Sequence, residues 1–134
     1  MTASPEAIIK AYYDAFNVQN LEKFLDLLTE DVQHDINQSG RETGKAAFAA
    51  FMQQMNQCYR ETVTDLVILT APDGTRAAAE FTVHGEYLQA APGMPPAHGQ
   101  KYTLPAGAFF TLRDDKIARV SNFYNLPDWL AQVS

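Results

Sequence analysis

The chain of 134 residues has very few of the features that mark secreted or membrane-bound proteins. It contains one cysteine, Cys58, so an internal disulfide is impossible, and we expect a small, semi-buried apolar residue there. The first four residues lack the basic region and the following apolar run of a signal peptide. No stretch approaches the roughly 20 apolar residues that span a bilayer. These absences predict a cytoplasmic protein that does not enter a membrane.

Positive charge is also scarce. The chain has 10 Lys and Arg against 16 Asp and Glu, a formal net charge of -6, and no basic run. Because an acidic surface repels phosphate backbones, a nucleic-acid partner is not expected. Hydrophobic residues make up 46% and charged residues 19%, which is typical of a globular protein. The length then predicts a single domain over residues 1–134 with one main core.

Motifs for metals and phosphates are missing as well. His34, His84 and His98 are far apart in the sequence, and there is no His-x-x-x-His pair or cysteine pair to hold a metal. There is no glycine-rich phosphate loop and no G-x-S-x-G elbow. We therefore expect neither a metal nor another cofactor.

The first third of the chain carries a helical pattern. Ser4 and Pro5 are typical of a helix start, and Ile9, Tyr12, Tyr13 and Phe16 follow at helical spacing. Asn20 can cap a second helix, with Leu21, Phe24, Leu25 and Leu28 on one face and an end at residues 29–31. A third helix is predicted from about Gly44, with Phe48, Phe51, Met52 and Met55 on one face.

The rest of the chain is typical of strands. Alternating or β-branched residues predict strands over residues 32–37, 62–70, 76–88, 100–113 and 116–125, with residues 126–133 as a short tail or final helical turn. Turn residues such as Pro72-Asp73-Gly74 and Asp114-Asp115 separate them. Three N-terminal helices followed by a strongly curved, mostly antiparallel sheet give an α+β fold, which can enclose an apolar pocket.

Several segments are similar to those of a known family. Residues 11–17 read AYYDAFN, 31–35 DVQHD, 40–48 GRETGKAAF, 81–87 FTVHGEY, 93–100 GMPPAHGQ and 115–120 DKIARV. In this order they resemble the nuclear-transport-factor-two-like superfamily, in its ketosteroid isomerase-like and SnoaL-like branch. The resemblance covers nearly the whole chain and implies a cone-shaped half-barrel with an apolar pocket.

The resemblance implies that Asp35 is a general base. In ketosteroid isomerases the matching aspartate moves a proton beside a carbonyl group, and an apolar wall raises its pKa toward the useful range. The DVQHD segment is one residue shorter than the family's pattern, so two registers are open. Strand alternation puts His34 on one face and Asp35 on the other. If the register slips, His34 enters the pocket and Asp35 turns outward.

Tyr12 falls where the isomerases carry the tyrosine of their oxyanion hole, counting back from Asn17. A phenol there donates a hydrogen bond to a developing enolate oxygen. The second donor of that hole, an aspartate, falls at Gly107 in this chain. Since Gly107 has no side chain to donate, the resemblance does not extend to a true steroid isomerase.

Other residues are candidates for the pocket wall. Those predicted to bind a substrate are Phe16, Phe81, Val83, Tyr87, Tyr102, Phe109, Asn122 and Tyr124. By strand alternation His84 faces the opposite way from Phe81 and Val83.

Three interpretations remain at this stage. The first is a cofactor-free isomerase-, cyclase- or lyase-like enzyme acting on a small apolar carbonyl compound, with Asp35 or His34 as base and Tyr12 as donor. The second is a non-catalytic protein that binds a small apolar molecule in the same pocket, which the missing donor at Gly107 favours. The third is a dimerisation module with a filled pocket. A homodimer is expected in all three cases, because the helices leave a broad face of the sheet uncovered.

Overall fold

The computed structural model describes residues 3–134 and contains four helices and six strands. Their bounds are α1 Pro5–Asn17, α2 Leu21–Asp26, β1 Leu28–Asp35, β2 Arg41–Thr43, α3 Lys45–Cys58, β3 Tyr59–Thr70, β4 Arg76–Tyr87, β5 Gln100–Arg113, β6 Lys116–Tyr124 and α4 Leu126–Val133. The predicted α+β class is confirmed. No helix among the described residues is long and apolar enough to cross a membrane.

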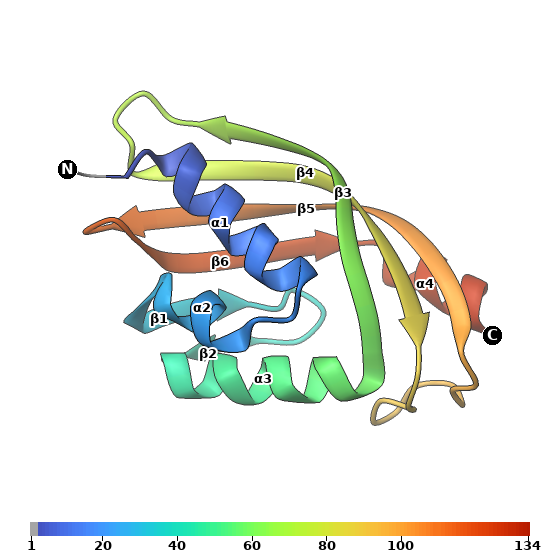
Figure 1. The fold of residues 1–134 in the computed structure, drawn as a ribbon. Coiled ribbons are helices and arrows are strands. Elements are labelled where there is room, and N and C mark those ends of the chain that lie inside the picture. Colours follow the sequence, from blue (N-terminus) through green and yellow to red (C-terminus); the bar gives the residue numbers. More distant parts are fainter. Residues whose placement is uncertain (1–2) are drawn as a thin grey trace.

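All six strands form one sheet in the order β2-β1-β6-β5-β4-β3. The β1–β6 pair is parallel and the other pairs are antiparallel. The sheet is strongly curled but does not close, and α1 crosses it diagonally (Figure 1). Helix α3 contacts β1 and β2 at one edge and β3 at the other, so it bridges the open side of the half-barrel.

Side-chain caps explain where three of the helices begin. The Ser4 hydroxyl accepts from the Ala7 amide at the start of α1, and the Asn20 and Asn125 side chains accept from backbone amides at the starts of α2 and α4. Helix α3 begins after Gly44, whose φ of 104° suits glycine.

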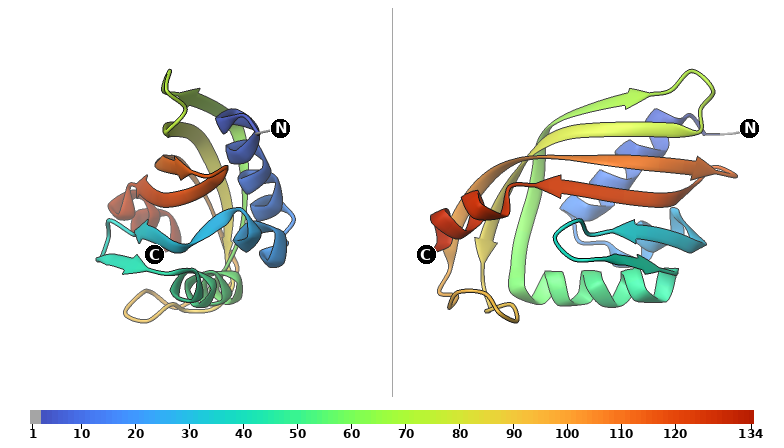
Figure 2. Two further views of the ribbon diagram at one scale, coloured as in Figure 1. Left: turned by 90° about the vertical axis from the view of Figure 1, so that its left-hand side faces the viewer. Right: turned by 180° about the vertical axis from the view of Figure 1, so that it is seen from behind.

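The core lies between α1, α3 and the concave face of the sheet. Ile9, Leu28 and Val120 are fully buried there, together with aromatic rings from α1, α2 and α3. A second cluster forms where α4 packs on the bent end of β5, seen from behind in Figure 2, and contains Tyr87, Tyr102 and Trp129.

Several element bounds differ from the predictions. Helix α2 ends at Asp26, and β1 runs from Leu28 to Asp35 instead of 32–37, because Leu28 already pairs with Ile117 of β6. Strand β2 was not predicted, and β3 begins at Tyr59 instead of residue 62. The C-terminal segment is a helix of 8 residues, capped by Asn125.

Candidate functional site

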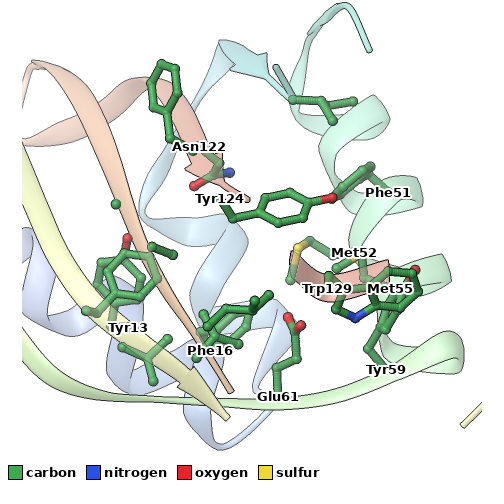
Figure 3. A pocket seen from close by; sticks show the side chains of 18 of the residues that line it. Tyr13, Phe16, Phe51, Met52, Met55, Tyr59, Glu61, Asn122, Tyr124 and Trp129 are labelled. Carbon is green, nitrogen blue, oxygen red and sulfur yellow. The ribbon is translucent and has the colours of Figure 1, made fainter. Parts of the chain in front are cut away.

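A cavity of about 200 Å³ lies between α1, α3, α4 and the concave face of the sheet. Most of its wall is apolar, with aromatic rings and the methionines Met52, Met55 and Met94. Figure 3 shows Glu61 and Asn122 reaching into the cavity from different sides. Binding sites for small organic molecules usually have this composition, with a mostly apolar wall and a few polar groups.

His34 lies in this wall and is 2% exposed. Its ring stacks on Phe48 at a centroid distance of 4.1 Å and meets the ring of Phe51 edge-on. Nε2 lies 3.4 Å from the amide nitrogen of Asn122, whereas Nδ1 lies 3.8 Å from the Glu42 carboxylate and has no hydrogen-bond partner among the described residues. Burial lowers the pKa of His34 to about 4, partly opposed by the charge of Asp35. The imidazole is therefore neutral at physiological pH.

Asp35 does not line the cavity, and its placement corrects the expectation of a carboxyl in an apolar pocket. Its carboxylate accepts from Arg41 Nε at 2.5 Å and from Arg119 Nε at 3.0 Å. These guanidinium groups, Arg41 first, hold the pKa of Asp35 below its usual value. The physical reason is register: β1 pairs His34 with Val120 and Asp35 with Ser121, which turns His34 inward and Asp35 outward. This is the slipped register that the sequence left open.

Both tyrosines of α1 lie at the cavity and are buried. The ring of Tyr12, the predicted donor, packs against Phe24 at 4.5 Å and edge-on against Phe110. The Tyr13 hydroxyl is buried without a hydrogen-bond partner among the described residues. Burial raises the pKa of both phenols, so both keep their protons. Both tyrosines are thus candidate donors to a ligand, and helical spacing could not separate them.

Glu61 of β3 also lines the cavity, and the sequence reasoning did not identify it. The Tyr102 hydroxyl donates to its Oε2 at 2.5 Å. Burial raises the pKa of the Glu61 carboxyl, and the hydrogen bond from Tyr102 partly opposes this. The predicted strand began one residue after Glu61. Its alternation with Val63, which faces inward, was the signal that could have placed it in the cavity.

Residues 9–120 match the model of the SnoaL-like domain. The chain belongs to the SnoaL-like domain family. It is 57% identical to a candidate polyketide cyclase from Pseudomonas putida, with a TM-score of 0.97 over 98% of this chain and 99% of that one. A candidate polyketide cyclase from Xanthomonas campestris is 51% identical, with a TM-score of 0.94 over 97% and 96%. Curated protein sequences gave no significant match.

More distant structures share the fold alone. An LEH-like epoxide hydrolase from M. tuberculosis is 14% identical, with a TM-score of 0.78 over 98% of this chain and 86% of that one. The predicted superfamily is thereby confirmed, since the family model and these neighbours agree.

The predicted wall residues of this SnoaL-like domain divide into two groups. Those that line the cavity are Phe16, Phe81, Val83, Asn122 and Tyr124. The other three do not. Tyr87 is fully buried and its hydroxyl donates to the Pro95 carbonyl, and Tyr102 reaches the cavity only through Glu61. Phe109 is 52% exposed on the outer face, because inward and outward residues alternate along β5.

The remaining polar positions give no further site residue. His84 faces outward and contacts Thr64 Oγ1 at 2.9 Å. Residues 3–134 contain no group of three His, Cys, Asp or Glu side chains that could hold a metal. Gly107, to which the resemblance assigns the second donor, borders the cavity.

Proposed function

We propose that this SnoaL-like domain is a cofactor-free enzyme that transfers protons on a small apolar carbonyl compound, in an isomerase- or cyclase-like reaction. The observation that carries the proposal is His34: a neutral, buried imidazole in the wall of an apolar cavity. The similarity of the chain to candidate polyketide cyclases also supports a carbonyl substrate, since ring closure of a polyketide needs a proton removed beside a carbonyl.

The imidazole is arranged to accept a proton. With its own proton on Nδ1, facing the Glu42 carboxylate, His34 accepts a long hydrogen bond of 3.4 Å from the Asn122 amide at Nε2, and a substrate C–H would take the place of this donor. The proton taken from carbon moves to Nε2, and the Glu42 carboxylate then lies close to the new positive charge. The hydroxyls of Tyr12 and Tyr13, which both line the cavity and keep their protons, are the candidate donors to the enolate oxygen.

Proton transfer can be tested without knowing the natural substrate. The protein is incubated in D₂O with a panel of small aromatic ketones and 1,3-diketones, and deuterium uptake beside the carbonyl is followed by NMR. We expect exchange above the protein-free rate, and a loss on the order of a hundredfold or more in His34→Asn, as is typical when a general base is removed. Gln54→Ala, an exposed change on α3, serves as the control and should keep the wild-type rate.

Binding is measured in parallel. Trp129 is the single tryptophan of the chain and lines the cavity, so its fluorescence reports on an occupant. Ketones that change this fluorescence in wild type and in His34→Asn, but exchange only in wild type, support the enzyme. Binding with no exchange in either protein would reject catalysis in favour of a ligand-binding protein. Gly107, which offers no side-chain donor, is the observation that favours that alternative.

We also propose a homodimer. Large apolar side chains are exposed on the outer face of the sheet, including Phe109 at 52% and Phe123 at 48%. The cytoplasmic location expected from the lone Cys58 stays a prediction.

A further inference from the structure

We propose that Glu61 is a second acid/base group of the cavity, that the Tyr102 hydroxyl positions it, and that Gly85 makes the arrangement possible. The inference rests on the proposed function for the substrate class, but the arrangement itself can be tested separately. It adds a proton donor to the reaction for which His34 supplies the acceptor.

The three residues lie in one row across three neighbouring strands. Glu61 of β3 pairs with Gly85 of β4, and Gly85 pairs with Tyr102 of β5. A Cβ atom on Gly85 would overlap Cζ, Cε2 and the hydroxyl oxygen of Tyr102. The tyrosine ring therefore lies across the bare backbone of β4, and its hydroxyl reaches a carboxyl two strands away. Only glycine at position 85 leaves room for the Tyr102 ring to lie there.

The surroundings of Glu61 suit a carboxyl that exchanges a proton. Among residues 3–134, no Lys, Arg or His lies within ion-pair distance of the Glu61 carboxylate, and the Tyr102 hydroxyl is the one side-chain group that forms a hydrogen bond with it. In Figure 3 the carboxyl points into the cavity between Phe16 and Trp129. Burial raises the pKa of this group. A carboxyl with a raised pKa and access to a ligand is a recurrent feature of general acids.

The proton balance is simple. Because the Tyr102 hydroxyl donates to Oε2, the proton of the acid form of Glu61 belongs on Oε1. As His34 Nε2 takes a proton from carbon, the C–H electron pair forms a C=C bond and the carbonyl π pair moves to oxygen. That oxygen takes the proton of Glu61, giving an enol, a carboxylate and an imidazolium. The reverse proton movements restore both side chains.

The first experiment is a titration of the Glu61 carboxyl by ¹³C NMR in the wild-type protein and four variants, with Glu61→Gln used to assign the signal. We expect a wild-type midpoint above the ordinary value of about 4.3. Tyr102→Phe removes the donor to the charged form and should raise the midpoint by about one pH unit or more. Gly85→Ala displaces the ring and should give the same rise, with no further change in the double variant. Gly40→Ala, with open space at its Cβ, should leave the midpoint unchanged.

An ordinary midpoint in wild type, or no rise in Tyr102→Phe, would overturn the arrangement. If Gly85→Ala does not fold, Tyr102→Phe still decides.

The deuterium exchange assay then tests the chemical role: Glu61→Gln should lose exchange by about a hundredfold, as expected for a general acid. If Glu61→Gln exchanges at the full rate and His34→Asn loses exchange, the acid/base role of Glu61 is rejected and the role of His34 stands. No exchange in wild type would reject the proposed function, and the titration would still test the Glu61–Tyr102 pair.

Discussion

At the scale of single residues, the buried His34 makes the stability of the fold depend on pH. Its pKa falls from about 6.5 in an unfolded chain to about 4 in the fold. Between pH 6.5 and 4 the unfolded chain binds a proton at His34 and the folded chain does not. The free energy of unfolding therefore falls as the pH drops from 6.5 to 4, and the contribution of His34 is fully present above pH 6.5. At 1.36 kcal/mol per pKa unit the loss reaches about 3 kcal/mol. Urea unfolding of wild type and His34→Asn at pH 7, 5.5 and 4 should show a steeper decline in wild type.

Asp35 supplies the contrast within the same strand. Its pKa lies below the usual value because of Arg41 and Arg119, so its contribution is present above about pH 4 and is lost only as the pH falls further. Asp35→Asn should therefore lower stability at pH 7 and keep the wild-type slope between pH 6.5 and 4. Equal slopes in wild type and His34→Asn over that range would show that the imidazole is not held neutral by the fold.

The placement of these side chains shows what alternation in a sequence can and cannot predict. Alternation separates His34 from Asp35, but it does not say which of the two faces the core. That choice is made by the parallel pairing of β1 with β6, a contact between residues more than 80 positions apart. Phe109 is a different case. Since Tyr102 and Phe110 face inward, parity along β5 already puts Phe109 on the other face.

At the scale of elements, Asn17 connects the end of α1 to the edge strand β3. Its side-chain Nδ2 donates to the Val63 carbonyl at 3.0 Å, and its Oδ1 accepts from the Val63 amide at 2.7 Å. Asn17→Ala leaves both backbone groups of Val63 without these partners, so we expect a loss of about 2 kcal/mol in the free energy of unfolding. Asn17→Asp keeps the acceptor but sets a carboxylate against the carbonyl, and it should also destabilise. Urea unfolding at pH 7 measures both changes.

The matched control is Gln54→Ala on the exposed face of α3, which should change stability by no more than about 0.5 kcal/mol. An equal, small effect of Asn17→Ala would mean that water replaces the amide at the sheet edge.

The two shortest of the late-recognised elements share a cause. Strand β2, which was not predicted, has three residues, and α4, predicted only as a short tail or final helical turn, has eight; such short elements carry little periodicity of their own. Tertiary contacts stabilise them: β2 pairs with β1, and α4 buries Trp129 against Tyr59, Tyr87 and Tyr102. Because α4 covers this end of the sheet, Tyr87 and Tyr102 are core residues there and not part of the cavity surface.

At the scale of the whole molecule, the order of helices and strands and the family motifs were sufficient to predict the fold. They indicate which segments form the half-barrel, and the family model and neighbours agree. The cavity was predictable as an apolar hollow, but its polar groups were not. Glu61 depends on where β3 begins, and its partner Tyr102 depends on the empty position at Gly85.

The outer face of the sheet leads to the prediction for the assembled molecule. Two cross-strand rows carry its apolar side chains. Leu69, Ala78 and Phe109 form one, and Val67 and Phe123 lie in the other, with Glu80 and Gly107 between them. Phe109 and Phe123 contact each other edge-on at 5.6 Å, and both are about half exposed. A second copy would cover this patch around a two-fold axis.

Sedimentation at micromolar concentration should therefore give twice the chain mass of 14.9 kDa for wild type. Phe109→Lys should reduce the mass to that of one chain, because a buried ammonium opposite its own copy is costly. Val18→Lys, at an apolar residue that is 74% exposed next to α1, should remain a dimer. A wild-type protein with the mass of one chain would mean that the patch is open to solvent, and the cavity would then function within a single subunit.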